Sequence, residues 1–409
     1  MKKSRIFALV LALALCFTTL AACGNSNETP TSADPNASAA PSDNGTSSTS
    51  SDIIKIGVIA PLTGDVAVYG TAVNNGVKLY TKQFNEAGGL NGKQVELVIY
   101  DDKGDATEAL NAYNKLVTSD QVVAIIGPVT SSPTFGVAQK SVADNMPCIT
   151  ASATHPDVTT YGSNFFRACF EDPFQGGTMA SFAKNELKVS TAAIIYNTSD
   201  AYSTGLMESF TAKAQEVGLS IVATEGYAKG DVDFNAQLTN IAGKNPDVLF
   251  IPDYYNTAYL ICAQARQLGI QSTFLGVDGT DGVLTIEDAD TSVFNGMYYP
   301  NHYYSGDTSE IVQTFQTAYK TEYNQDPNSF SALGYDSAQI LFNAIEAAEN
   351  AGQTIDNSAE CRQAIIDQLK ATDLTCLTGH IQFDENNNPI KECTIIKIED
   401  GKDSFYGKY

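Results

Sequence analysis

Short runs of aliphatic and β-branched residues alternate with longer amphipathic segments along most of this chain. The runs indicate buried strands because they are apolar throughout and are separated by turn residues. They form two sets, 53–60, 94–101, 122–127 and 147–150 in the first and 192–196, 219–225, 247–252 and 273–277 in the second. The segments between them have helical spacing, and continuous apolar strands with helical crossovers are typical of parallel sheets covered on both faces. The pattern therefore predicts an α/β chain with two similar doubly wound lobes.

The last third of the chain breaks this cycle. Helical patterns cover 308–324, 329–352 and 358–371, and two strand-like runs follow at 380–384 and 393–398. The loop between these runs, DENNNP, has turn chemistry and predicts that they form a hairpin. We expect the chain to return to the first lobe and to finish in the second. The expected lobes are 53–170 plus 301–376, and 171–300 plus 377–409, joined by three crossing strands that act as a hinge.

The first residues form an export signal. Lys2, Lys3 and Arg5 precede an apolar run at 6–20, and the sequence LAAC then ends at Cys23. A positive segment, a short apolar segment and a small-residue site are typical of a signal peptide. The cysteine at its end predicts cleavage after residue 22 and a lipid on Cys23, which anchors a protein to the cell membrane without spanning it. We therefore expect an extracytoplasmic lipoprotein.

The segment that follows Cys23 is almost free of apolar residues. Residues 24–51 consist mainly of Ser, Thr, Pro, Asn and Ala. Such a segment buries too little surface to offset its ordering entropy, so it is predicted to be a disordered tether. The chain as a whole has a formal net charge of −23. This charge argues against a nucleic-acid partner, because phosphate binding needs clustered Lys and Arg.

The cysteines after the tether are widely spaced. They are Cys148, Cys169, Cys262, Cys361, Cys376 and Cys393. An exported protein can form disulfides, and a bond between Cys376 and Cys393 would join two neighbouring strands. The alternative is that most of these cysteines are small buried apolar residues. Spacing alone does not determine their pairing.

Polar residues follow neighbouring strands of the first predicted lobe. Thr130, Ser131 and Ser132 come directly after a strand, and Pro133 suits the first turn of the next helix. Ser131 or Ser132 is expected to cap that helix, whose N-terminal amides favour an anion such as a carboxylate. The stretch ITASATHPDVT at 149–159 repeats the arrangement after the next strand. Caps of this kind occur in most helices, but two at neighbouring strand ends indicate a ligand site.

Tyrosines and one aspartate extend this pattern to both lobes. Tyr69, Tyr202 and Tyr254 each follow a predicted strand, and Tyr255 could exchange roles with Tyr254. Together they would supply apolar walls with polar tips. Asp278 adds a carboxylate at another strand end, although an Asx turn in Asp278-Gly279 explains the same residue.

Sequence signatures of enzymes are missing. The chain has no GxSxG elbow, no GxxxxGK[ST] loop and no GxGxxG turn. His155, His302 and His380 are far apart and lack metal-ligand spacing. His155 precedes a proline within the polar stretch, and we expect it to take no part in the site. We predict neither an enzyme nor a protein with a metal or cofactor.

Several motifs in their order resemble a known family. They are IKIGVIAPLTGDVAVYG, NEAGGLNGKQVELVIYDDKGD, IIGPVTSSPT, MPCITASATHPDVT and FFRACFEDPFQGG. This chain is similar over nearly all of 53–400 to the leucine/isoleucine/valine-binding components of ABC transporters, which have the periplasmic-binding fold of type I. The resemblance implies an extracytoplasmic protein, acting as a monomer, that binds a small amino acid between two lobes and delivers it to a permease with its ATPase.

The resemblance also implies roles for individual residues. Ser131 and Thr154 match hydroxyls that bind the ligand carboxylate, and the Ser152 carbonyl matches an acceptor for its ammonium. The backbone of Ala153 and Thr154 would line the same floor. Asp278 matches an acid that pairs with the ammonium, where the family commonly has the longer Glu. The aromatic positions around the ligand match Tyr69, Tyr202 and Tyr254.

Other functions stay open on the sequence alone. The same fold can serve as a ligand-sensing module of a receptor or regulator. The ligand of a transport protein could also be another small carboxylate, amide or aromatic acid, because the volume of the pocket depends on packing that the sequence does not fix.

Overall fold

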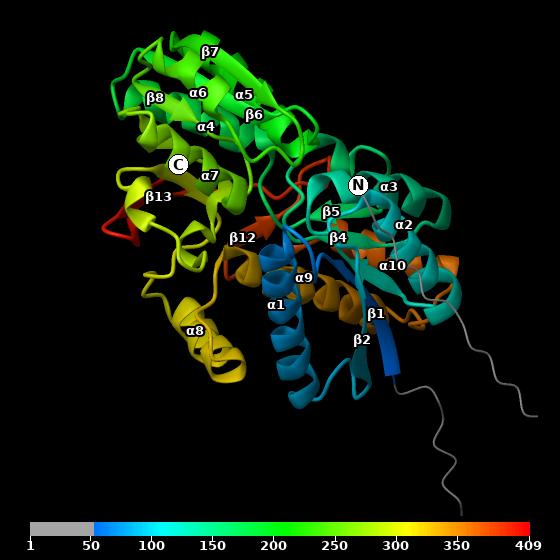
Figure 1. Cartoon of the computed structure of the whole chain (residues 1–409). Helices are drawn as coiled ribbons and strands as arrows, with labels where there is room; N and C mark the ends of the chain where they lie inside the picture. Colours follow the sequence, from blue (N-terminus) through cyan, green and yellow to red (C-terminus); the bar gives the residue numbers. More distant parts are fainter. Residues whose placement is uncertain (1–52) are drawn as a thin grey trace, which may run out of the picture. The chain divides into compact units, whose positions relative to one another are not determined.

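The computed structural model of the chain describes residues 53–409 (Figure 1). The predicted signal peptide, Cys23 and the tether lie outside these residues. Between residues 53 and 409, no helix combines the length and the apolar character needed to cross a membrane.

The first sheet is entirely parallel, with the strand order β2-β1-β3-β4-β5. Its two faces are covered by helices, and two core clusters show which helix covers which face. The helices α1, α9 and α10 pack on one face, and α2 and α3 pack on the other. The strands are β1 (Ile53–Ala60), β2 (Gln94–Asp101), β3 (Ala124–Ile126), β4 (Cys148–Thr150) and β5 (Phe165–Arg167), and the helices are α1 (Ala67–Glu86), α2 (Ala106–Lys115), continued by a π-helix (Leu116–Asp120), α3 (Ser131–Asp144), α9 (Ser329–Asn350) and α10 (Ala359–Lys370).

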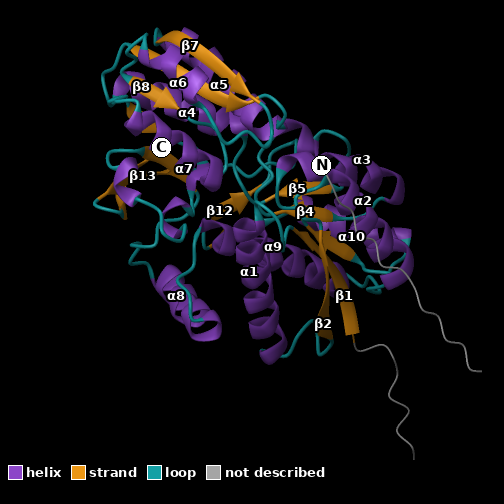
Figure 2. Cartoon of the chain, viewed as in Figure 1, coloured by secondary structure: helices purple, strands orange, loops and turns teal. Residues whose placement is uncertain are grey.

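The second sheet has the order β14-β13-β10-β9-β8-β6-β7. Its strands from β7 to β10 are parallel, whereas β13 and β14 run antiparallel to their neighbours at one edge. The helices α6 and α7 pack on one face, and α4 and α5 pack on the other (Figure 2). The strands are β6 (Thr191–Asn197), β7 (Ser220–Tyr227), β8 (Val248–Phe250), β9 (Thr273–Leu275), β10 (Tyr298–Asn301), β13 (Thr394–Glu399) and β14 (Lys402–Lys408), and the helices are α4 (Asp172–Asn185), α5 (Ala201–Val217), α6 (Asn235–Ala242) and α7 (Tyr255–Gln267).

The two sheets share one topology. In each, the first strand along the chain lies between the second and the third, so β1 separates β2 from β3, and β6 separates β7 from β8. On either side of this central strand, the crossover helices pack on opposite faces of the sheet. Ligands of open α/β sheets bind at such a point, outside the carboxyl ends of the strands. The chain passes between the lobes in three segments, 168–171, 302–309 and 384–393. The predicted fold class, two doubly wound α/β lobes, is confirmed.

The predicted hairpin between 380–384 and 393–398 is wrong. The strand β12 (Gly379–Gln382) pairs with β11 (Asp373–Cys376), whereas β13 pairs with β10 and β14. The loop DENNNP does turn, because Asp384 Oδ1 accepts from the N–H groups of Asn386 and Asn388. The loop is tied to the first lobe, however, where the Asn387 amide donates to the Phe165 carbonyl. The hairpin at this end of the chain instead turns at Asp400-Gly401, both with positive φ, as expected for an Asp-Gly turn.

The last crossing between the lobes also lies later than predicted. Ile381 and Phe383 pack into the core of the first lobe, together with residues of α9. The Asp336 carboxylate of α9 accepts from the N–H groups of Leu377 and Thr378. These contacts keep residues 377–383 with the first lobe. The helix α8 (Glu310–Tyr323) also belongs to this lobe, because it packs beside α1 in a small separate core cluster.

The disulfide between Cys376 and Cys393 that the sequence left open is not formed. All six cysteines of the described residues are free and buried. Cys376 ends β11, whereas Cys393 precedes β13 of the other sheet, so the two do not lie on neighbouring strands. Burial raises the pKa of each of these thiols. They are therefore small buried residues, as in the alternative interpretation of the sequence.

Candidate functional site

A small cavity lies where the carboxyl ends of both sheets meet. Its volume is about 10 Å³. The lining residues come from loops and helix starts that follow β1, β3, β4, β6, β8 and β9, and from α9. They are Tyr69, Val129, Thr130, Ser131, Ser152, Tyr202, Tyr254, Asp278, Gly279 and Phe330. The structure thus places the predicted residues Tyr69, Ser131, Ser152, Tyr202, Tyr254 and Asp278 around one cavity.

Two further predicted residues, Ala153 and Thr154, lie behind this lining. The Ala153 N–H donates to Thr150 Oγ1 at 3.1 Å, and its carbonyl accepts from the Arg167 guanidinium at 3.1 Å. The Thr154 carbonyl accepts from the N–H of Asp172 at 3.0 Å. These contacts hold the polar stretch after β4 in place beneath Ser152. The histidine of this stretch, His155, points its ring at Phe135 and away from the lining residues.

The first lobe contributes neutral polar groups to the cavity. Ser131 is the first residue of α3, so the unpaired N–H groups of that helix start beside it. Its Oγ accepts from the N–H of His155 at 3.3 Å, and Ser152 Oγ donates to the Val129 carbonyl at 2.9 Å. None of the lining residues of this lobe is charged. Hydroxyls beside the positive end of a helix dipole form a site suited to an anion.

The second lobe contributes a carboxylate. Asp278 follows β9 in a tight 3-10 turn, and its Oδ1 accepts from the Tyr202 hydroxyl at 2.5 Å and from the amide of Gln175 at 3.1 Å. The adjacent Gly279 N–H donates to the same oxygen at 3.0 Å. The Asx turn that was the alternative for this residue is not formed, because the Thr280 N–H donates to the Val277 carbonyl, and the carboxylate lines the cavity instead.

No cation among the described residues neutralises this carboxylate. The nearest basic side chain is His302, whose Nε2 lies 3.5 Å from Asp278 Oδ2. Burial lowers the pKa of His302 to about 4, so the imidazole is neutral at physiological pH. No Lys or Arg belongs to the lining. The carboxylate is therefore available to pair with a bound cation.

A second buried acid lies next to Asp278. The Gln175 amide bridges the two carboxylates, donating to Asp172 Oδ1 at 3.2 Å and to Asp278 Oδ1. Burial raises the pKa of Asp172 well above its usual value, and the Asp278 charge raises it further. Sequence reasoning gave no role to Asp172 or Gln175. The signal was present, because both belong to the motif FEDPFQGG that supported the family resemblance.

Aromatic side chains form the walls and join the lobes. The Tyr69 hydroxyl of α1 donates to the Gly279 carbonyl at 2.5 Å and accepts from the Tyr255 N–H at 2.8 Å, both in the second lobe. Its ring lies 4.3 Å from that of Phe330, a lining residue that sequence reasoning did not identify. The Tyr202 and Tyr254 rings stack at 4.9 Å. The two adjacent tyrosines contribute differently. Tyr254 lines the cavity with its side chain, whereas Tyr255 donates its backbone N–H to the Tyr69 hydroxyl.

Gly279 leaves room for close packing within the second lobe. A Cβ at this position would lie 2.8 Å from the Tyr202 hydroxyl and 3.2 Å from the Asp253 carbonyl. A second contact between the lobes lies outside the cavity, where Ser132 Oγ donates to Asp200 Oδ2 at 3.1 Å. Two α/β lobes that meet in this way define a class of protein that encloses a small polar molecule at their interface.

Comparison with known proteins gives this class a family. The chain belongs to the Periplasmic binding protein family, which it matches over residues 53–403. Proteins of this family are extracytoplasmic and bind solutes without catalysing a reaction, so the chain is not an enzyme.

Two relatives illustrate the similarity. The Leu/Ile/Val-binding protein BraC3 of Rhizobium johnstonii is 29% identical over 353 residues, which cover 85% of this chain and 92% of the relative. A leucine-, isoleucine-, valine-, threonine- and alanine-binding protein of Pseudomonas aeruginosa is 28% identical over 83% of this chain and 88% of its own length.

Solved structures agree. The leucine-binding protein LivK of Thermotoga maritima is 31% identical, with a TM-score of 0.79 over 87% of this chain and 98% of that chain. The branched-chain amino acid transporter substrate-binding protein LivJ of Streptococcus pneumoniae, solved with isoleucine, gives the same identity, TM-score and coverage.

Proposed function

We propose that this protein binds a small amino acid, of the branched-chain aliphatic class, between its two lobes. The polarity of the cavity carries this proposal. Asp278 on the second lobe has no cationic partner among the described residues, while the start of α3 with Ser131 and Ser152 faces it from the first lobe. A zwitterion fits this arrangement, because its ammonium pairs with the carboxylate and its own carboxylate takes the hydroxyls and amides.

The side chain of the ligand would meet aromatic walls. Tyr69, Tyr202, Tyr254 and Phe330 line the cavity, and their rings offer apolar surface of the kind that an aliphatic side chain needs. The names of the relatives, which specify leucine, isoleucine and valine, support this assignment.

Binding requires the lobes to move. A cavity of about 10 Å³ holds roughly one water molecule, so an amino acid can enter only when the lobes separate. The contacts of Tyr69 with Gly279 and Tyr255 would then break and re-form. A ligand that touches both lobes stabilises the closed state over the open one.

The cellular role that we propose is delivery of the amino acid to the permease and ATPase of an ABC importer. The protein would act as a monomer held at the membrane by a lipid on Cys23, with residues 23–51 as a tether. The lobes would comprise 53–170 with 302–383, and 171–301 with 394–409; the core contacts of Ile381 and Phe383 support the later boundary.

A ligand screen tests the function. We expect leucine, isoleucine or valine to raise the melting temperature of the purified protein and to bind in isothermal titration calorimetry. The other amino acids, short amides and aromatic acids form the comparison set. No shift with any aliphatic amino acid would contradict the assignment, and a shift with an amide or aromatic acid would identify a transport protein for that solute. Binding without any effect of gene deletion on uptake would favour a ligand-sensing module.

The anchor is tested separately. We expect the full chain to fractionate with membranes and the Cys23→Ala variant to be released into the soluble fraction, since the lipid is attached at that sulfur. Equal fractionation of the two proteins would contradict lipidation at Cys23.

A further inference from the structure

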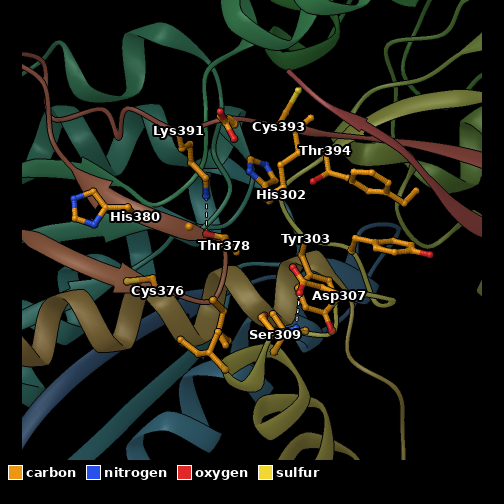
Figure 3. Close-up of a pocket in the computed structure, with 18 of the residues that line it drawn as sticks. His302, Tyr303, Asp307, Ser309, Cys376, Thr378, His380, Lys391, Cys393 and Thr394 are labelled. Carbon is orange, nitrogen blue, oxygen red and sulfur yellow. Dashed lines mark hydrogen bonds between the residues drawn. The ribbon is translucent and has the colours of Figure 1, made fainter.

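A second and larger cavity lies at the hinge. Its volume is about 820 Å³, within the range of small-molecule sites. Two of the chain segments that cross between the lobes supply much of its lining, with residues 302–309 on one side and 390–393 on the other, and β11–β12 close it from the first lobe (Figure 3). A molecule in this cavity would contact the parts of the chain that must change when the lobes rotate.

His302 is in contact with residues of both this cavity and the smaller one. His302 lines the hinge cavity, and its Nε2 lies 3.5 Å from Asp278 Oδ2 of the smaller cavity. The imidazole is stacked on Phe170, with ring centroids 3.7 Å apart, so its orientation is restrained by packing. A molecule bound in the hinge cavity would therefore contact His302, and His302 contacts Asp278, the carboxylate proposed to pair with the ligand ammonium.

The interior of the hinge cavity offers a cation. The Lys391 amine donates to the Ala168 carbonyl and to Thr378 Oγ1, at 3.2 and 2.6 Å, which leaves one of its three N–H groups for another acceptor. Figure 3 shows the amine directed at Thr378. Within residues 53–409 no carboxylate forms an ion pair with it. Burial lowers the pKa of Lys391, an effect that a bound anion would offset.

The charge of one buried acid, Asp336, acts on Lys391 and raises the pKa of its amine, but among the described residues the two form no ion pair. The Asp336 carboxylate already accepts from the N–H groups of Leu377 and Thr378 and from the Thr378 hydroxyl. Glu392 and Asp307 also line the cavity; Glu392 is exposed, and Asp307 is half-buried and accepts from the Ser309 N–H. Solvent screens such surface charges, so they oppose an anion at Lys391 only weakly.

The walls of the hinge cavity are apolar and unusually exposed. Ile390, Phe405 and Ile311 line it and are 71%, 50% and 40% exposed. Leu377 and Tyr303 also line it and are buried. Exposed apolar side chains gathered around one cavity indicate a site for an apolar group.

We propose that the hinge cavity binds a monocarboxylate with an apolar body, its carboxylate on Lys391 and its chain against Ile390 and Phe405. The cavity is present in the arrangement in which Tyr69 bridges the lobes. Its occupant therefore stabilises the closed state and raises the affinity of the interlobe site. The hinge cavity is a regulatory site, distinct from the amino-acid site.

Octanoate is a suitable probe, titrated into the full chain with no amino acid present. We expect saturable binding that becomes about tenfold weaker in Lys391→Met, which removes one charge-assisted hydrogen bond. Octanamide, which lacks the charge, should bind wild type and Lys391→Met equally weakly. Phe405→Ser and Ile390→Ser should each weaken octanoate binding without unfolding the protein, because both side chains are exposed.

Val232→Ser is the matched control, since Val232 is 66% exposed and does not line the cavity. We expect it to bind octanoate like wild type. The absence of saturable binding, or equal binding by wild type and Phe405→Ser, would overturn the site.

Coupling to the interlobe site is measured with isoleucine and rests on the proposed function. Saturating octanoate should lower the dissociation constant of isoleucine, and isoleucine should lower that of octanoate by the same factor. Unchanged constants would overturn the regulatory role. If isoleucine does not bind at all, the proposed function fails, while the octanoate titrations still decide whether the hinge site exists.

Discussion

The carboxyl edges of the two sheets share a strand order and differ in chemistry. In the second lobe, aspartates follow β6, β8 and β9, as Asp200, Asp253 and Asp278. In the first lobe, the strands β3 and β4 that line the cavity are followed by Ser131 and Ser152. One edge is therefore acidic, and the other offers hydroxyls and the N–H groups of a helix start.

This difference teaches that topology and polarity are specified separately. The shared strand order places both switch points at the same interface. The residues at those points then decide which charge each lobe binds: the first lobe suits an anion, and the second lobe suits a cation. Each lobe alone can pair only one end of a zwitterion, and burying the other end without a partner is costly. Tight binding therefore requires both lobes, which makes closure selective for the ligand.

The largest expected effect on affinity comes from removing the charge of Asp278, at the carboxyl edge of the second sheet. Asp278→Asn keeps the shape of the side chain but removes the partner of the ligand ammonium. We expect the dissociation constant for the amino acid to rise about a hundredfold, or roughly 3 kcal/mol. The melting temperature of the unliganded protein should stay the same or rise, because the repulsion with Asp172 is relieved. Calorimetric titration and a thermal melt measure the two quantities.

Asp288→Asn is the control for this variant. Asp288 is an exposed acid after β9 that does not line the cavity, so its removal should change neither quantity. An unaltered dissociation constant in Asp278→Asn would remove Asp278 from the site.

A smaller effect on affinity is expected from a change at the carboxyl edge of the first sheet. Ser131→Ala removes one neutral hydroxyl and leaves the helix N–H groups, so affinity should fall about tenfold. Ser141 lies in the same helix, buried and bonded to the Ala138 carbonyl and Asn164. Ser141→Ala should lower the melting temperature and leave affinity unchanged. If both variants bind like wild type, the first lobe does not use Ser131 for the ligand.

The contact between the lobes is tested by Tyr69→Phe. This change removes the hydroxyl that bonds the Gly279 carbonyl and the Tyr255 N–H, bonds that exist only when the lobes meet. We expect affinity to fall about fivefold, or roughly 1 kcal/mol. Tyr113→Phe is matched to it, because the Tyr113 hydroxyl bonds Asp144 within the first lobe. That variant should lower the free energy of unfolding and preserve affinity, and the reverse pattern would show that Tyr69 does not hold the lobes together.

The last effect concerns the pH dependence of stability. Burial raises the pKa of Asp253 to about 8 and that of Asp102, in the first lobe, to about 7. The folded state then keeps protons that the unfolded chain has lost, so the free energy of unfolding falls as pH rises toward 8. Between pH 6.5 and 8, above the range in which His155 and His302 oppose this trend, the loss from Asp253 should be about 1.6 kcal/mol.

Denaturant unfolding at the two pH values measures this loss. Asp253→Asn should flatten the dependence, and Asp102→Asn should flatten it less because its pKa is nearer to that of the unfolded chain. If Asp102→Asn flattened the pH dependence more than Asp253→Asn did, the carboxyl with the more strongly raised pKa would be Asp102, in the first lobe.

Local patterns predicted most elements of the fold. The runs 53–60 and 94–101 are β1 and β2 with the predicted ends, and the helix predicted at 329–352 is α9. The strands β5 (FFR) and β10 (YYPN) were missed, although the equally short β3 and β8 were found, because Arg167 and Pro300 interrupt their apolar runs. The hairpin was misplaced because turn chemistry at DENNNP shows that the chain turns, but not which strands it joins. The Asp-Gly turn at 400–401 carried the stronger hairpin signal.

The sequence by itself determined where most strands and helices form, that the chain has two α/β lobes, and which polar residues stand at strand ends. These features depend on the periodicity and turn preferences of neighbouring residues. Only the tertiary structure decided that Gln175 and His302 surround Asp278, and that residues 302–309 and 390–393 enclose a second cavity. Such contacts join residues far apart in the chain, and the packing that selects them leaves no local pattern to read.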